Sequence, residues 1–255
     1  MNRTITAAIW GMMMVAIATP ISSAQPRPAM RNQPGVGGVV NLPYVINDAN
    51  GGIWRIYQGG WMQQQGNMPA YSQGAMLMIN GQQAGQNSNQ AKLDEKTGEL
   101  VLSDVNGNGL VVERRILFDK TNSFVRYIDV LRNPQNQPQT FNVMIQSSTN
   151  YGINAAQYVP DPKKKEQNIG WVAQTGAGVA VVEVFAGHNS KVVPNMSWPQ
   201  GNNFVQASFS LAIAGGKEVA IMHLHRVAAS ADAGVQFISG LKDNVLLKSI
   251  PAALR

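Results

Sequence analysis

Residues 124–146 read FVRYIDVLRNPQNQPQTFNVMIQ and carry the clearest fold signal of the chain. In the second half of this stretch, the apolar residues Phe141, Val143 and Ile145 alternate with less apolar neighbours. Successive side chains of a β-strand point to opposite faces of the sheet, so this alternation predicts a strand with one buried and one largely wet face. The turn-forming residues 133–136, NPQN, join it to a preceding apolar strand. The stretch therefore predicts a β-sheet protein.

The same pattern of short apolar segments between turn residues extends in both directions, which is typical of an all-β protein. Turns at 94–98 and 106–109 contain the Gly and Asn residues that supply the positive φ angles of tight hairpins. Segments at roughly even spacing predict a large antiparallel β-sandwich of two sheets. The expected strands are Gly52–Tyr57, Ala75–Asn80, Leu100–Ser103, Leu110–Phe118, Phe124–Leu131, Thr140–Gln146, Gly170–Gln174, Val179–Phe185, Phe204–Ile213 and Glu218–Val227.

Helix signals are confined to the C-terminal region. Ser230 can cap a helix over residues 231–241, with Asp232 in its first turn, where a negative charge interacts favourably with the helix dipole. A second short helix, interrupted by Pro251, is expected over Leu246–Leu254. Both helices would pack against the sheets as an appendage that starts at about residue 230.

The N-terminus has the three parts of a bacterial-type secretory signal peptide. Arg3 gives a positive start, Ala7–Ala18 is an uncharged apolar run, and Pro20 ends that run. Small residues up to Ala24 then predict cleavage before Gln25. The apolar run is shorter than the about 20 residues that span a bilayer. An N-terminal anchor that is never cut, or a buried helix, is the alternative.

This pattern makes residues 1–24 a signal peptide, so we expect a periplasmic or secreted protein. The Pro- and Gly-rich segment 25–38 is expected to be a linker, and residues 39–255 to form a single domain. No later apolar run is long enough to cross a membrane; the longest, Val179–Ala186, contains Glu183.

The chain contains no cysteine, so its fold depends on burial without disulfide bonds. The absence of cysteine also excludes thiol nucleophiles, lipid-modified cysteine, cysteine-bound zinc and iron–sulfur clusters. The net charge is +6, but the only dense basic run is Lys163–Lys165, which is expected to be a solvated loop tip. An anionic glycan or phosphate surface is the alternative partner, and a nucleic-acid partner is not expected.

The histidines form the sharpest candidate site. His223 and His225 are two residues apart on a predicted strand, so both rings project from the same face. With His188, they would provide the three ligands of a catalytic zinc site. The alternative is that they are structural histidines and that the protein has no cofactor. No Gly-x-Ser-x-Gly, phosphate-binding or dinucleotide-binding motif is present.

Charged residues on neighbouring strands suggest a second site. Arg114 or Arg115 is expected to pair with Asp129 across the strand ladder, as a structural ion pair. A pair of catalytic carboxylates of the glycosidase type is the alternative, and it would need Glu113 or Glu183 close to Asp129.

Aromatic residues are the candidate ligand-binding groups. The segment 56–91 has no charged side chain and is rich in amides, which can donate and accept hydrogen bonds to sugars. Trp61 and Tyr71 lie in this segment, and Trp198 lies in a later loop. These three are the predicted glycan-binding residues, whereas Trp54 and Trp171 are expected in the core.

The strand pair at residues 114–134 resembles a module of large secreted bacterial proteins. It carries an R-x-x-F pattern ending at Phe118 and an F-x-R-x-x-D-x-x-x-N pattern from Phe124 to Asn133. Over about residues 100–227 the chain is similar in shape to the wide sandwich folds of galactose-mutarotase-like and polysaccharide-lyase domains. The resemblance implies a fold; the catalytic His and Glu of mutarotases have no matching positions here.

These observations lead to three functional hypotheses. The first is an exported, non-enzymatic β-sandwich that binds another envelope protein or a polysaccharide. The second is a carbohydrate-active enzyme, mutarotase- or lyase-like, on the same fold, with Asp129, Glu183 and the histidines in a cleft. The third is a histidine-ligated metalloprotein.

Overall fold

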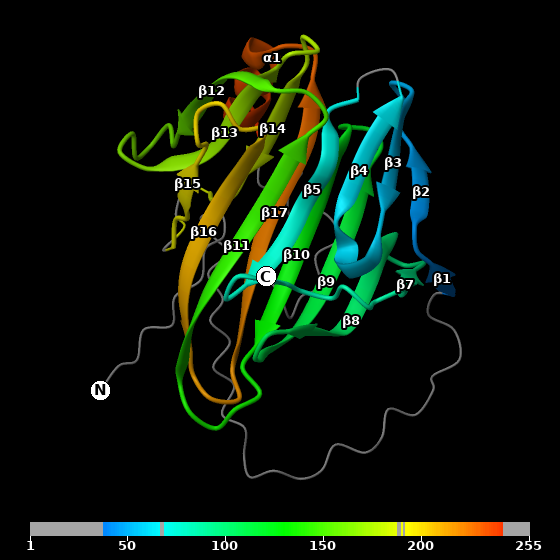
Figure 1. Cartoon of the computed structure of the whole chain (residues 1–255), viewed down its shortest axis with the longest axis vertical. Helices are drawn as coiled ribbons and strands as arrows, with labels where there is room; N and C mark the ends of the chain where they lie inside the picture. Colours follow the sequence, from blue (N-terminus) through cyan, green and yellow to red (C-terminus); the bar gives the residue numbers. More distant parts are fainter. Residues whose placement is uncertain (1–37, 67–68, 188–189, 191, 242–255) are drawn as a thin grey trace.

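The computed structural model of the chain describes residues 38–66, 69–187, 190 and 192–241. Within these residues the protein is an antiparallel β-sandwich of two sheets with one α-helix near the C-terminal end (Figure 1). The predicted fold class is therefore confirmed.

Several predicted features lie outside the described residues. These are the signal peptide at 1–24, the linker at 25–38 except its last residue, and the second helix at Leu246–Leu254. In the part of the chain that is described, no helix has the length and apolar character needed to cross a membrane.

The first sheet has nine strands, and every ladder in it is antiparallel. In spatial order the strands are β1 (Val39–Asn41), β7 (Gln90–Asp94), β8 (Glu99–Gly107), β9 (Leu110–Asp119), β10 (Phe124–Arg132), β17 (Glu218–Ala228), β14 (Ala180–Val184), β13 (Asn168–Thr175) and β12 (Ile153–Pro160).

The second sheet has eight strands and faces the first (Figure 1). In spatial order they are β15 (Asn195–Ser197), β16 (Phe204–Ile213), β11 (Gln139–Thr149), β5 (Tyr71–Ile79), β4 (Met62–Gly66), β3 (Gly52–Ile56) and β2 (Tyr44–Asn47), with β6 (Gln82–Gln83) paired to β5. A short 3-10 helix, η1 (Gln58–Gly60), joins β3 to β4.

The two strands of the opening sequence stretch belong to different sheets. β10 is in the nine-stranded sheet and β11 in the eight-stranded sheet, so the turn between them carries the chain across the sandwich. Asn133 is buried in this turn, where its side-chain Nδ2 donates to the carbonyls of Gln137 (2.9 Å) and Ile213 (3.0 Å). Ile213 is the last residue of β16, and the chain then returns to the first sheet as β17. The Asn133 side chain therefore joins the two turns that connect the sheets at this end of the sandwich.

The predicted alternation of side chains places the core between the sheets. Phe141, Val143 and Ile145 are buried in the main apolar cluster, whereas Asn142 is exposed. The positive φ angles expected at the hairpin turns are present at Gly98 and at the Asn108–Gly109 pair. Every predicted strand overlaps an observed one, and the observed sheets also contain β1, β2, β4, β6, β7, β12 and β15.

The helix α1 (Ala231–Ser239) covers part of the outer face of the nine-stranded sheet. Its N-cap is Ser230, as predicted, whose Oγ accepts from the Ala233 amide at 3.2 Å. Gly234 lies directly over the sheet, where an added Cβ would be 2.8 Å from Val182 and 2.9 Å from Val172. A second apolar cluster, which includes Ile238, therefore fills the space between helix and sheet.

Candidate functional site

Five neighbouring strands of the nine-stranded sheet point polar side chains into the sandwich. The ladder sets Arg114 opposite Asp129, His225 opposite Glu183, and Glu183 opposite Trp171. Because side chains two residues apart on a strand share a face, His223 lies on this same inner face. We call this set the buried row; its members are Arg114 on β9, Asp129 on β10, His223 and His225 on β17, Glu183 on β14 and Trp171 on β13.

At one end of the buried row, Arg114 forms an ion pair with Asp129. Its Nε donates to Oδ1 of Asp129 at 2.7 Å, which confirms the predicted partner for this carboxylate. The remaining donors of Arg114 reach the backbone carbonyls of Gly59 (2.9 Å) and Ala75 (3.0 Å), both on the side of the eight-stranded sheet. Ala75 adopts a φ of 55°, a left-handed conformation that is uncommon for a residue other than glycine. The Arg114 side chain therefore links the two sheets.

The row continues through the two histidines. Nε2 of His223 lies 3.0 Å from Oδ2 of Asp129, and Nδ1 of His223 lies 2.6 Å from Nε2 of His225. Nδ1 of His225 lies 3.0 Å from Oε1 of Glu183, whose other oxygen accepts from the indole N–H of Trp171 at 3.2 Å. The contacts form one unbroken chain from β9 to β13.

Each contact in the row pairs a donor with an acceptor. A neutral imidazole has one N–H and one bare nitrogen, so the contact between the two rings pairs the N–H of one ring with the bare nitrogen of the other. The Arg114 guanidinium supplies the positive charge that faces the Asp129 carboxylate. A network in which each polar group has a partner is the arrangement that a low-dielectric interior tolerates best.

Electrostatics assign the charges at the Asp129 end. Burial lowers the pKa of His223 to about 3, although the hydrogen bond to Asp129 acts in the opposite direction. Burial alone would raise the pKa of Asp129, but the Arg114 guanidinium and the His223 hydrogen bond outweigh it and lower this pKa. At neutral pH Asp129 is therefore charged and His223 is neutral.

Two tyrosines enclose the histidine pair. The Tyr127 ring stacks on His223 with centroids 4.8 Å apart, and the Arg114 guanidinium lies 4.8 Å from its centroid. The buried Tyr127 hydroxyl has no hydrogen-bond partner in the described part of the chain, and burial raises the pKa of this hydroxyl. The Tyr71 ring meets His225 edge-on at 6.1 Å.

Tyr71 corrects one prediction. It was expected among the glycan-binding aromatic residues but is fully buried, and its hydroxyl lies 3.3 Å from the carbonyls of Val182 and Arg226 on the opposite sheet. A side chain whose ring and hydroxyl are both enclosed by the core cannot stack on a ligand at the surface.

The buried row is closed to solvent. Each of its six residues is at most 1% exposed. The enzyme hypothesis requires Asp129, Glu183 and the histidines in an open cleft; the structure brings these residues together, but in the interior. A substrate has no access to them there, so this arrangement provides packing and hydrogen bonding between strands.

The described residues do not complete the predicted zinc site. Among them, no group of three or more His, Cys, Asp or Glu side chains is arranged to hold a metal ion. His223 and His225 direct their facing nitrogens at each other. His188, the third predicted ligand, lies outside the described residues, so zinc binding stays a prediction.

The outer face of β3 and β4 carries a second group of residues, which we call the aromatic platform: Tyr57, Trp61, Gln63 and Gln65. Tyr57 and Trp61 stack with ring centroids 4.2 Å apart and planes 5° apart. The turn η1 between them makes this contact possible, because it reverses the chain within three residues. The Tyr57 hydroxyl donates to Oε1 of Gln63 at 3.0 Å, and Arg55 donates to Gln65. All these side chains are partly exposed.

Trp198, the third predicted ligand-binding aromatic, lies elsewhere. It follows β15, is partly buried against the main core, and donates its indole N–H to the carbonyl of Asn202 at 3.1 Å. The structure therefore does not bring Trp61 and Trp198 into one site, since β16, β11 and β5 separate β15 from β4.

The sequence indicates most members of the buried row one by one, but it does not indicate that they form a single hydrogen-bonded chain. The spacing of His223 and His225 correctly placed both rings on one face. The single acid in the apolar run Val179–Ala186 marked Glu183 as unusual. The link from Glu183 to Trp171 was missed, because it depends on the order of strands β14 and β13 in the sheet.

Comparisons with known proteins support the fold alone. No protein-family model matches the chain, and no curated protein matches it. Among solved structures, heparinase III has a TM-score of 0.50 at 10% identity, over 74% of this chain and 36% of that one. Heparan sulfate lyase HepC from Pedobacter heparinus has a TM-score of 0.48 at 10% identity, over 71% of this chain and 33% of that one.

A third match, a candidate aldose 1-epimerase from Escherichia coli K12, has a TM-score of 0.47 at 9% identity, over 74% of this chain and 99% of that one. The chain spans about a third of the length of the first structures that it matches. The match to heparinase III at a TM-score of 0.50 confirms the predicted resemblance in shape to wide sandwich domains, whereas activity does not follow from fold.

Proposed function

We propose that this protein is an exported, non-enzymatic β-sandwich that binds a glycan in the cell envelope or outside the cell. The observation that carries the proposal is the aromatic platform. A stacked Tyr57–Trp61 pair offers an apolar surface, and Gln63 and Gln65 beside it offer amide donors and acceptors. Sugars present a C–H face next to hydroxyl groups, so they match this combination.

Two further observations agree with binding without catalysis. The platform belongs to the segment 56–91, which contains no histidine, carboxylate or lysine side chain, the groups that most often act as general acid or base. The histidines and carboxylates that could do such chemistry are enclosed in the buried row. Export rests on the signal-peptide pattern of residues 1–24, and the fold is one that heparinase III shares.

The proposal is tested by retention on polysaccharides. The probes are chitin, cellulose, amylose and peptidoglycan sacculi, with dextran sulfate as the anionic comparison. We expect Trp61→Ala to weaken retention by about tenfold or more, since a lost aromatic contact is worth roughly 1.5–3 kcal/mol. The melting temperature should change by only about 2 °C. Trp61→Phe, which keeps a ring, should retain part of the binding.

The matched control is Tyr151→Ala, because Tyr151 is also an exposed aromatic residue (44% exposed) but lies outside the platform. This variant should bind like the unmodified protein. Equal retention of Trp61→Ala and the unmodified protein would contradict the platform as the binding site. Retention on dextran sulfate alone would contradict a neutral glycan.

A carbohydrate-active enzyme is the second candidate, because Asp129, Glu183, His223 and His225 meet in one hydrogen-bonded group. It requires the sandwich to open during the reaction, since these residues are closed to solvent in this structure. It predicts that the purified protein changes one of these polysaccharides, seen as new reducing ends or unsaturated products. It further predicts that Glu183→Gln abolishes this change in a protein that still folds.

A further inference from the structure

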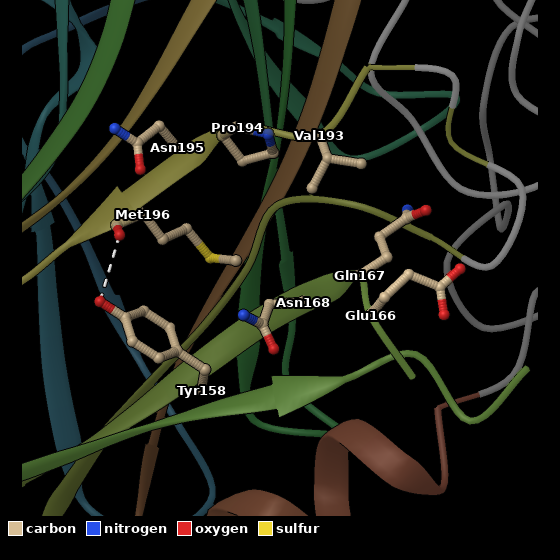
Figure 2. Close-up of a pocket in the computed structure, with 8 residues that line it drawn as sticks. All are labelled: Tyr158, Glu166, Gln167, Asn168, Val193, Pro194, Asn195 and Met196. Atoms are coloured by element: carbon tan, nitrogen blue, oxygen red, sulfur yellow. Dashed lines mark hydrogen bonds between the residues drawn. The ribbon is translucent and has the colours of Figure 1, made fainter. Parts of the chain in front are cut away.

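The sandwich has an open side where the edge strands of the two sheets face each other. β12 is the last strand of the nine-stranded sheet and β15 the last strand of the eight-stranded sheet. Between them lies a pocket of about 450 Å³, a volume within the range of small-molecule sites. The Tyr158 hydroxyl donates to the carbonyl of Met196 at 3.1 Å and so holds the phenol ring across this opening (Figure 2).

One part of the pocket is apolar. Tyr158 is 47% exposed and Val193 is 36% exposed, and Met196 lies beside them. In the described part of the chain, only five large hydrophobic side chains are this exposed, and two of them line this pocket. An exposed aromatic ring fixed by its own hydroxyl is a ready stacking surface, because little conformational freedom is lost when a ligand covers it.

The rest of the pocket is polar but nearly uncharged. Figure 2 shows the side chains of Gln167, Asn168 and Asn195 around the same opening as Tyr158. The amides of Asn168 and Asn195 make no side-chain hydrogen bond to the described residues, so their donors and acceptors remain available to a ligand. The one charged lining residue is Glu166, which disfavours an anionic ligand.

We infer that this pocket, which we call the edge pocket, is a second glycan-binding site for a neutral, hydroxyl-rich sugar. It has the same chemistry as the aromatic platform, namely one aromatic face beside amides. The adjacent run Lys163–Lys165 does not line it, so recognition there does not depend on phosphate or sulfate. The inference rests on the proposed function, which it deepens by adding a site.

The two sites are separate on the molecule. β15 and β4 are four positions apart in the eight-stranded sheet, which at about 4.8 Å per strand separates them by roughly 19 Å. One molecule would thus hold two glycan chains, or two parts of one chain. Binding to a long polymer then gains from two linked contacts, which raise apparent affinity far above that of either site.

The experiment measures stoichiometry and avidity in the same set of variants. Titration calorimetry uses the trisaccharides of chitin, cellulose and amylose, which are too short to reach both sites. Retention uses the corresponding polymers. The variants are Trp61→Ala, Tyr158→Ala, the double variant, and Tyr151→Ala as the control. Asn195→Ala, an exposed change, tests the pocket if Tyr158→Ala fails to fold.

We expect two trisaccharides per unmodified molecule, one per molecule for each single variant, and none for the double variant. Polymer affinity should fall about tenfold to 100-fold in each single variant, because the second contact is lost. Binding at one site that Trp61→Ala removes and that Tyr158→Ala or Asn195→Ala leaves unchanged would overturn the inference while the proposed function stands. A protein that binds none of the probes contradicts both.

Discussion

Arg114 shows how one side chain determines the interior of this protein. Its guanidinium donates hydrogen bonds to the Asp129 carboxylate and to the carbonyls of Gly59 and Ala75, and all of these acceptors lie inside the sandwich. A buried ion pair is expensive to form, but it is more expensive to break, because the remaining partner keeps an uncompensated charge.

Replacing Arg114 by Met should therefore destabilise the fold strongly. We expect a loss of about 3–5 kcal/mol in the free energy of unfolding, since Asp129 stays charged and two backbone carbonyls lose their donors. Urea titration followed by circular dichroism measures this loss. The matched control is Arg132→Met, an exposed arginine on the neighbouring strand β10, which should change stability by about 0.5 kcal/mol or less. Equal losses in the two variants would contradict the role of Arg114.

At the scale of single residues, the sequence predicted which residues pair more reliably than it predicted which residues are buried. The choice of Arg114 or Arg115 for Asp129 followed from the ladder, and only Arg114 is on the inner face. Tyr71 was misjudged because it lies in an amide-rich, uncharged segment that looks exposed. Its burial depends on Val182 and Arg226, more than 100 residues away, and no local pattern contains that information.

At the scale of elements, the predicted strands are those rich in apolar residues. Some alternate in burial, such as β9 and β16, and others are buried on both faces, such as β10 and β14. Strands β4 and β12 were not predicted, because β4 consists largely of Gln and β12 is a sheet edge without regular alternation. Such strands are defined by backbone hydrogen bonds to a neighbour. The edge pocket could not be predicted for the same reason, since β12 and β15 form its two sides.

The helix α1 tests which of two opposed effects is larger. Gly→Ala in a helix normally gains about 0.5–1 kcal/mol in helix propensity. At Gly234, however, the new methyl group would meet Val172 and Val182 at under 3.0 Å, and overpacking a rigid contact costs about 1–3 kcal/mol.

We therefore expect Gly234→Ala to lower the free energy of unfolding by about 1 kcal/mol or more. Thermal melting measures the effect. Gln236→Ala, at an exposed position of the same helix, should leave the melting temperature nearly unchanged. A higher melting temperature for Gly234→Ala would mean that α1 moves freely on the sheet.

At the scale of the whole molecule, stability should depend on pH through the buried row. The unfolded chain protonates His223 below about pH 6.5, whereas the folded protein does so only at about pH 3. Between these values the unfolded state binds more protons than the folded state. The contribution of His223 to the free energy of unfolding is therefore fully present above pH 6.5 and is lost as the pH falls. The slope from this one group is about 1.4 kcal/mol per pH unit.

The pKa of Asp129 is also lowered in the folded state. Its contribution to the free energy of unfolding is therefore lost only when the pH falls below the ordinary pKa of a carboxyl group, in stronger acid than the loss from His223. Urea titrations at pH 7.5, 6.0, 5.0 and 4.0 measure the dependence. His223→Gln should reduce the slope between pH 6 and 4. Stability that stays constant or rises over that interval would contradict a neutral, buried His223.

The position of β17 has a consequence for how the chain reaches its final form. This strand is the last in the described sequence, yet it lies between β10 and β14 and pairs with both. A polypeptide that emerges from a ribosome or a translocation pore N-terminus first cannot complete the larger sheet until about residue 228 is free. Until then β10 and β14 lack the strand that pairs with both of them, and contacts this remote in sequence form slowly. Because the larger sheet closes late, most of the chain can pass through a translocation pore before the fold is complete. This order of events suits a protein that we propose is exported.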